Sequence, residues 1–280
     1  MRSDKLPERS YLFVPANRPE RIGKAFAAGA DAVIADLEDA VAPDLKAAAR
    51  DALANALSAP APVLVRVNGA DTPWFEDDLA ACAAPGVAGI VLPKAERTQD
   101  VDCITERLGA DMPVLALIET ARGMADAEAI AACPAVRRLL FGSIDFQVDL
   151  GIEGGGTELL FFRSRLVLVS RLAGLDGPVD GVTVGFDDPA TTRADAQRAR
   201  REGFAGKLCV HPKQIAAVNA AFSPGAEEIA WAERVVAAAA AAGGDAVALD
   251  GKMIDKPVLA KAERILRVGG RFGQPAARVS

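Results

Sequence analysis

Short apolar runs alternate with longer amphipathic stretches along most of this chain, and this alternation constrains the fold more than any other feature. The runs are apolar over nearly their whole length instead of alternating with polar residues, as in DAVIADLED and PVLALIET. This pattern is typical of parallel strands that are buried on both faces. Eight such runs occur, at residues 9–15, 31–39, 62–68, 89–95, 113–120, 136–145, 180–186 and 206–212.

The stretches between the runs have the length of crossover helices. They are rich in alanine and amphipathic, for example at residues 19–30, 44–57 and 192–204. Eight such units predict a (β/α)8 TIM barrel, with a doubly wound open sheet as the alternative. We expect the barrel domain at residues 1–222 and a C-terminal extension at 223–280. The extension contains two helical stretches, 226–242 and 258–268, around a turn region at 243–257.

Composition and charge exclude several classes of protein. The 280 residues are 51% hydrophobic and 25% charged, which suits a folded globular chain. A net charge of −6 argues against nucleic-acid binding. The N-terminal residues lack the apolar segment of a signal peptide, and no run is long enough to cross a bilayer, so we expect a cytoplasmic protein without a membrane partner. Four cysteines without a CxxC pair indicate neither a disulfide framework nor a zinc site.

Polar residues close several of the apolar runs, at the edge where the catalytic groups of a barrel gather. In chain order they are Asp36, Glu38, Asp39, Arg66, Asn68, Lys94, Glu119, Asp145 and His211. Glu119 and Asp145 offer only oxygen donors, which Mg²⁺ prefers. A carboxylate in such a place can instead cap the following helix, and we favour that interpretation for Asp39 and Asp149.

Three of the other residues have two interpretations each. Arg66 can bind substrate or form a structural ion pair with Glu38, and the two roles are compatible. Lys94 can contact substrate or only balance the charge of the acidic cluster. His211 is the single histidine of the chain and is better explained as structural than as a general base. Residues 151–158, GIEGGGTE, match a phosphate-binding loop only loosely, and we expect a flexible loop there.

Eight segments, in one order over nearly the whole chain, carry a family resemblance. They are RSYLFVPANRPERIGKA, ADLEDAVAPDLKAAAR, VRVN, LPKAE, LIETARG, FGSIDF with the DLG that follows, GFAGKLCVHPKQIAAVN and GKMIDKPVLAKAERIL. Together they resemble the citrate lyase beta subunit and its relatives, the malyl-CoA and citramalyl-CoA lyases, of the HpcH/HpaI aldolase superfamily. The ordered set is far more specific than any one motif.

The resemblance implies a (β/α)8 barrel whose C-terminal helical extension acts as a lid, in a homotrimer or hexamer. It implies a Mg²⁺-dependent lyase that cleaves or forms a 3-hydroxyacyl thioester, such as citramalyl-CoA, malyl-CoA or a citryl thioester. The products are a keto acid and an acetyl thioester, and the acyl carrier is CoA or an acyl-carrier protein. Glu119 and Asp145 match the metal ligands, Arg66 the arginine near the thioester carbonyl, and Asp255 the acid of the MIDKP lid.

The reaction explains why these residue types are needed. Negative charge moves from the hydroxyl oxygen of the substrate to the thioester oxygen of an enolate, so both ends need stabilisation. The predicted catalytic residues are Arg66, which bonds the enolate, Asp255, which protonates it, and Glu38. Together with Asp39, Glu38 holds Arg66 and metal-bound water in place. The predicted substrate-binding residues are Arg66, Glu119 and Lys94, and the predicted metal ligands are Glu119 and Asp145.

The sequence departs from the family pattern at two places. Ile144 stands where an acidic residue often precedes the second metal ligand, and Thr183 and Phe186 lie in a region that often carries a tyrosine. The second departure leaves the preference for a particular substrate or for CoA undecided. Two other functions also remain: a class II barrel aldolase that acts on free hydroxy-keto acids, and a non-catalytic subunit of a lyase complex.

Overall fold

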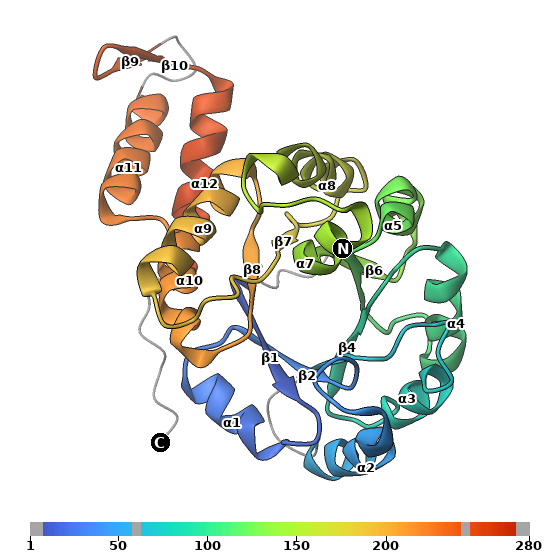
Figure 1. The fold of residues 1–280 in the computed structure, drawn as a ribbon. Coiled ribbons are helices and arrows are strands. Elements are labelled where there is room, and N and C mark those ends of the chain that lie inside the picture. Colours follow the sequence, from blue (N-terminus) through green and yellow to red (C-terminus); the bar gives the residue numbers. More distant parts are fainter. Residues whose placement is uncertain (1–7, 58–62, 242–246, 273–280) are drawn as a thin grey trace. The chain divides into compact units, whose positions relative to one another are not determined.

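The computed structural model describes residues 8–57, 63–241 and 247–272, and the chain divides into two compact units. The first unit lies within Pro7–Asn219, and the second begins at Ala220. The first is a closed barrel of eight parallel strands that follow one another in chain order, β1 to β8 (Figure 1). The predicted (β/α)8 barrel is confirmed, and the doubly wound alternative is wrong.

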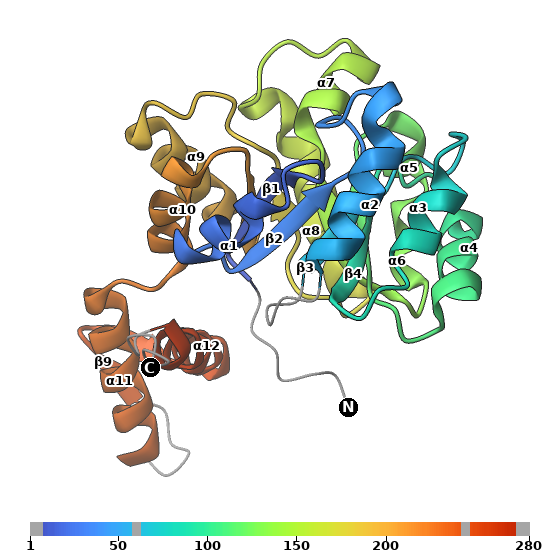
Figure 2. The same cartoon turned by 90° about the horizontal axis from the view of Figure 1, so that it is seen from below.

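Each barrel strand is short and is followed by helical structure that covers its outer face. The strands are β1 (Ser10–Pro15), β2 (Ala32–Asp36), β3 (Val63–Arg66), β4 (Val87–Leu92), β5 (Val114–Ile118), β6 (Val136–Phe141), β7 (Val179–Asp180) and β8 (Gly206–Cys209). The α-helices are α1 (Glu20–Ala27), α2 (Lys46–Ala56), α3 (Phe75–Ala81), α4 (Thr98–Leu108), α5 (Ala121–Ala125), α6 (Ala127–Ala132), α7 (Ser143–Leu150), α8 (Leu160–Leu172), α9 (Pro189–Glu202) and α10 (Ile215–Phe222). Three 3₁₀ turns are η1 (Pro43–Leu45), η2 (Thr157–Leu159) and η3 (Pro212–Gln214). Figure 2 shows α2, α3 and α4 outside the strands.

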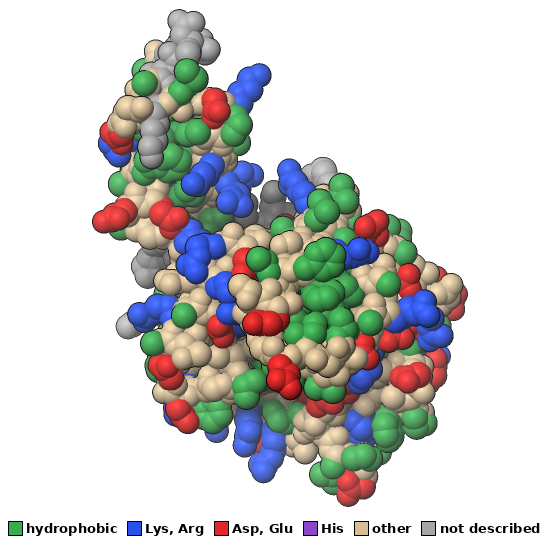
Figure 3. All heavy atoms as spheres, turned by 45° about the horizontal axis from the view of Figure 1, so that its top comes forward, with side chains coloured by type: hydrophobic (Ala, Val, Ile, Leu, Met, Phe, Trp, Pro, Cys, Tyr) green, Lys and Arg blue, Asp and Glu red, His purple; other side chains and the backbone are tan. Residues whose placement is uncertain are grey.

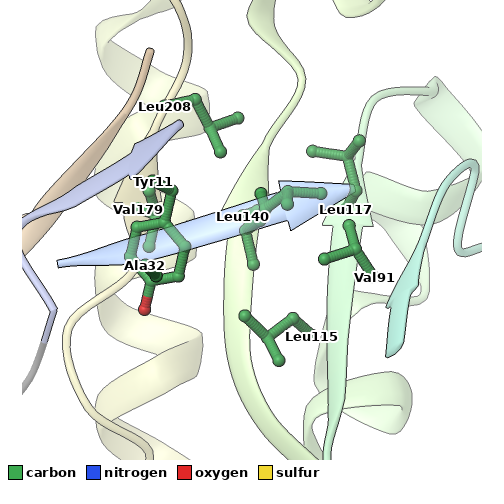
Figure 4. Packing of buried hydrophobic residues seen from close by; sticks show 9 residues of the cluster. Tyr11, Ala32, Val91, Leu115, Leu117, Leu140, Val179 and Leu208 are labelled. Atoms are coloured by element: carbon green, nitrogen blue, oxygen red, sulfur yellow. The ribbon is translucent and has the colours of Figure 1, made fainter. Parts of the chain in front are cut away.

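Apolar side chains from almost every strand fill the inside of the barrel. The buried cluster comprises Tyr11, Ala32, Ile34, Val91, Leu115, Leu117, Leu140, Val179 and Leu208 (Figure 4). Because successive side chains of a strand point to opposite faces, Asp180 and Lys207, which adjoin Val179 and Leu208, point to the outer face of the sheet. Both are nevertheless buried, at 0% and 2% exposure.

Most observed strands end before the expected runs do, and two of these differences change the interpretation. The run at 180–186 is a strand only at Val179–Asp180, and Val184 beyond it is 67% exposed. The β-branched residues of that segment imitate a strand but lie in a loop. The run at 136–145 ends as a strand at Phe141, because the chain turns at Gly142 and enters α7. Asp145 therefore lies in the first turn of a helix and not at the end of a strand.

Within its described residues, the second unit contains helices α11 (Ala226–Ala241) and α12 (Lys256–Phe272) and a hairpin. Helix α11 packs on α12, and β9 (Val247–Leu249) pairs antiparallel with β10 (Lys252–Ile254). The hairpin was not predicted. Asp250 and Gly251 join its strands with φ angles of 51° and 73°, as the tightest hairpin turns require. The Asp-Gly pair between the short segments VAL and KMI was the signal that could have revealed it.

Large hydrophobic side chains are exposed on α7 and α8. Val148, Phe161, Leu168 and Leu172 are 58% to 80% exposed, and Figure 3 shows hydrophobic side chains gathered on one face of the barrel. A surface of this kind is typical of a contact with another protein molecule. Within the described residues, no helix is both long and apolar enough to cross a membrane.

Candidate active site

Five of the six predicted site residues lie at the same edge of the barrel. Arg66 is the last residue of β3, while Glu38, Lys94 and Glu119 follow β2, β4 and β5 within two residues. Asp145 is in the first turn of α7, after β6. In a parallel barrel the carboxyl ends of all strands meet at one edge, so these five side chains come from adjacent places.

Arg66 is 8% exposed and is held by carboxylates. Its Nε and Nη2 donate to the two oxygens of Asp36, at 2.8 and 2.6 Å. Its Nη1 lies 3.0 Å from Glu38 Oε2 and 3.4 Å from Asp39 Oδ2. The guanidinium also stacks over the ring of Phe13 at 4.7 Å. Burial lowers the pKa of Arg66, but the hydrogen bonds and charge of Asp36 outweigh burial and raise it overall, so Arg66 is a fixed cation.

Asp36 is one of the strand-end acids, but the sequence assigns it no role of its own. Besides Arg66, it accepts hydrogen bonds from the main-chain N–H groups of Glu38 and Ala40 at 2.9 and 3.1 Å. It therefore fixes both the arginine and the loop that carries Glu38. Lys46 is a second residue of this kind, because its Nζ donates to the carbonyls of Leu37 and Glu38. Neither role is visible in the sequence, since both depend on contacts across the loop.

Glu38 lies between the two cations of this edge. Its Oε1 accepts a 2.8 Å hydrogen bond from Lys94 Nζ. Its Oε2 is near Arg66 Nη1, yet the bond geometry is poor and this buried atom accepts no hydrogen bond from the described residues. Burial raises the pKa of Glu38, and the charge of Arg66 and the bond from Lys94 oppose that rise. The predicted ion pair of Glu38 with Arg66 is present, and Lys94 forms a second ion pair with Glu38.

Glu119 is the most deeply buried acid of the predicted set, at 3% exposure. Its Oε1 accepts a 2.8 Å hydrogen bond from the main-chain N–H of Lys94. Burial, followed by the charge of Glu38, raises its pKa to about 8; the Lys94 N–H opposes this rise and the charge of Asp145 adds to it. The anion is therefore costly here unless a cation accompanies it.

Asp145 contrasts with Glu119 because it is exposed on the first turn of α7. It lies near enough to Glu119 for its charge to raise the pKa of that carboxyl. No group of three or more His, Cys, Asp or Glu suited to a metal occurs within residues 8–57, 63–241 and 247–272. Two carboxylates without nitrogen or sulfur ligands suit Mg²⁺, which keeps several waters or substrate oxygens. The two residues therefore fit a divalent cation. The raised pKa of Glu119 supports this fit, because its buried carboxylate is unfavourable without a nearby cation.

The sixth predicted residue, Asp255, belongs to the second unit. It is exposed and precedes α12, where its Oδ1 accepts a hydrogen bond from the N–H of Val258 at 2.9 Å. This is the geometry of a helix N-cap. The described contacts of Asp255 are thus structural, and its predicted role as an acid stays a prediction.

The remaining polar residues at the strand ends have structural contacts. His211 Nδ1 accepts from Lys213 N, and its ring stacks on Phe186 at 4.5 Å. Thr120, not Glu119, caps α5 through the N–H of Gly123. Asp149 accepts from the N–H of Ala121 and so binds the start of α5 from the end of α7. The expected capping role of Asp39 is not seen, because its carboxylate pairs with Arg66.

Comparisons with known proteins identify relatives over most of the chain. A profile described as HpcH/HpaI aldolase/citrate lyase matches residues 9–212. A citrate lyase subunit beta-like protein of Deinococcus radiodurans is 42% identical over 92% of this chain and 96% of its own. A (3S)-malyl-CoA thioesterase of Cereibacter sphaeroides is 37% identical over 94% of this chain and 97% of its own. The crystal structure of CitE from Mycobacterium tuberculosis with magnesium, acetoacetate and coenzyme A is similar at a TM-score of 0.82 and 36% identity, over 94% of this chain and 98% of that chain.

Proposed function

This chain belongs to the HpcH/HpaI aldolase/citrate lyase family, and from that membership we propose that it is a Mg²⁺-dependent carbon–carbon lyase acting on a 3-hydroxyacyl-CoA thioester. The observation that carries the proposal is the buried Glu119 beside a fixed Arg66 at the carboxyl edge of the barrel. The magnesium and coenzyme A bound to the similar CitE structure support both the metal and the thioester.

Glu119 and Asp145 would hold the metal. When bound there, Mg²⁺ supplies Lewis acidity and orients the hydroxy-carboxylate half of the substrate. The hydroxyl oxygen gives its proton to bulk water and becomes the carbonyl of the keto acid as the carbon–carbon bond breaks. The electron pair of that bond passes to the thioester, which leaves as an enolate.

Arg66 would stabilise the enolate oxygen. Asp36 occupies the edge of the guanidinium formed by Nε and Nη2, so the edge formed by Nη1 and Nη2 is the one that can meet substrate. Among the described residues, the exposed Asp39 and Oε2 of Glu38 are the acids paired with Nη1 on that edge. A donor that is already rigid costs no reorganisation when charge develops on the substrate. Lys94 would contribute a second positive charge beside the acids.

Asp255 would give the enolate carbon its proton, from a neighbouring subunit of a homotrimer or hexamer. It is exposed at the start of α12 and outside the barrel unit, and the exposed apolar side chains on α7 and α8 provide a surface for subunit contact. The Glu119→Gln and Asp255→Ala homomers should each be nearly inactive. Co-refolded mixtures should regain activity, because some sites then combine an intact Glu119 with a neighbour's intact Asp255. Mixtures no more active than their parents would contradict delivery between subunits.

Thioester hydrolysis is the second candidate, and the 37% identity to a (3S)-malyl-CoA thioesterase favours it. Incubation with Mg²⁺ and malyl-CoA, citramalyl-CoA or citryl-CoA separates the two. Keto acid with acetyl-CoA indicates the lyase, whereas free CoA with the intact hydroxy acid indicates the hydrolase. Cleavage of a free hydroxy-keto acid without CoA would favour a class II aldolase. No product from any of these substrates would favour a non-catalytic subunit.

A further inference from the structure

Lys94 has a backbone conformation that is unusual for its residue type. Its φ is 45°, and the only other non-glycine residue with positive φ in the described part of the chain is Asp250, in the hairpin turn. A left-handed conformation costs an ordinary L-residue free energy, so surrounding contacts must maintain it. At Lys94 the conformation accompanies two contacts: the main-chain N–H bonds Glu119 Oε1, and Nζ bonds Glu38 Oε1, both at 2.8 Å.

Gly142 confines Glu119 from the other side. A Cβ on Gly142 would lie 2.5 Å from Glu119 Cβ and closer still to Glu119 Oε2, which no real structure tolerates. The φ of Gly142 is −81°, which any residue can adopt, so its backbone does not require glycine. The glycine is needed for space alone. It immediately follows β6 and stands three residues before Asp145.

We infer that Lys94 and Gly142 are positioning residues that fix the carboxylate of Glu119 in one orientation, through the Lys94 N–H and through the absent side chain of Gly142. Glu119 Oε1 then accepts the hydrogen bond from the Lys94 N–H. Glu119 Oε2 lies beside Gly142, which directly follows β6 and precedes Asp145 by three residues. The arrangement spans three neighbouring strands, β4, β5 and β6. This inference rests on the proposed function, because it explains how Glu119 is presented to a cation.

The first test measures Mn²⁺ affinity by electron paramagnetic resonance, without substrate. Gly142→Ala should bind Mn²⁺ roughly tenfold to a hundredfold more weakly than the wild type, the usual cost of disturbing residues that orient a ligand. Gly23→Ala is the matched control, because a Cβ on Gly23 would meet nothing within 4 Å. Lys94→Gly should keep nearly the wild-type affinity, since glycine retains the N–H and adopts positive φ freely. Equal affinity in Gly142→Ala, or an equal loss in Lys94→Gly, would overturn the inference.

The second test needs no metal and separates this inference from the proposed function. Gly142→Ala should lower the melting temperature of the wild type but have much less effect in a Glu119→Gly background, where the opposing Cβ is gone. If Gly142→Ala alone does not fold, a folded double variant would show that the Glu119 side chain is the cause. An equal loss in both backgrounds would refute the clash. A wild type that binds no Mn²⁺ would refute the metal role and leave this coupling intact.

Discussion

Two clusters of buried charge in the barrel differ in how their acids are neutralised. In the β7–β8 cluster, formed by Arg163, Asp180 and Lys207, Asp180 is 0% exposed and lies 3.0 Å from Arg163 Nε and 3.4 Å from Lys207 Nζ. Burial raises the pKa of Asp180, but Lys207 and Arg163 outweigh burial and lower it overall. In the β2–β5 cluster, formed by Asp36, Glu38, Arg66, Lys94 and Glu119, the pKa of Glu119 is raised to about 8.

The difference favours a structural role for the β7–β8 cluster and a functional role for the β2–β5 cluster. Asp180 is surrounded by cations that compensate for its burial, so it stabilises the sheet against α8. Arg66 and Lys94 pair with Asp36 and Glu38, and among the described residues no basic side chain forms an ion pair with Glu119. An acid that is buried without a cation weakens the fold, and such acids are concentrated at functional sites.

The largest expected effect on activity is that of Glu119→Gln. Because the variant removes a proposed ligand, turnover should fall by at least about a thousandfold, the upper range for loss of one stabilising group. The variant should stay folded, since the amide removes a carboxylate whose burial is unfavourable. Steady-state kinetics with saturating Mg²⁺ and circular dichroism test both parts. An active variant would show that the β2–β5 cluster does not need this acid.

Asp180→Ala should lower stability strongly and turnover little, the reverse of Glu119→Gln. Removing one partner of a buried ion pair leaves Arg163 and Lys207 uncompensated and should cost about 3–5 kcal/mol of unfolding free energy. Urea unfolding measures this change. Turnover per folded molecule should remain close to that of the wild type, because the cluster lies on the outer face of the sheet. Little loss of stability together with a large loss of turnover would reverse the assignment of the two clusters.

Arg66→Lys should lower turnover by roughly a hundredfold and leave KM nearly unchanged. Arginine uses one edge of its guanidinium to bond both oxygens of Asp36 and leaves the other edge for the enolate. Lysine keeps the positive charge but has a single ammonium group, which cannot do both. Separate determination of kcat and KM provides the test. A rise in KM at constant kcat would make Arg66 a ground-state substrate contact instead.

The smallest expected effect is a pH dependence of stability. The pKa of Asp180 is lower in the folded chain than the unfolded value of about 3.9, so its stabilisation is present above about pH 4 and is lost as pH falls through the folded pKa. The difference in unfolding free energy between the wild type and Asp180→Asn should therefore shrink in acid. Urea unfolding from pH 6 to about pH 3 measures the difference. A difference in unfolding free energy that does not change with pH would mean that Asp180 acts by hydrogen bonding and not by charge.

The sequence predicts the barrel well because strands buried on both faces leave continuous apolar runs. It fails at 180–186, where the valines and threonine of a loop imitate a strand. It also predicts the edge at which the charged residues gather, since residues such as Arg66 and Glu119 end those runs. The role of Asp36 is not predicted, because it depends on an arginine 30 positions away. The spatial need for Gly142 likewise appears only once Glu119 lies against it.

We propose that the β2–β5 cluster lacks one cation, which Mg²⁺ supplies. Thermal melting of the metal-free wild type, Glu119→Gln and Asp180→Asn with and without Mg²⁺ tests it directly. The wild type and Asp180→Asn should both gain several degrees with Mg²⁺, because a ligand that binds only the folded state stabilises it. Without metal, Glu119→Gln should melt at or above the wild-type temperature and should not respond to Mg²⁺. A Glu119→Gln protein that melts well below the metal-free wild type, or that Mg²⁺ stabilises as strongly, would contradict the account.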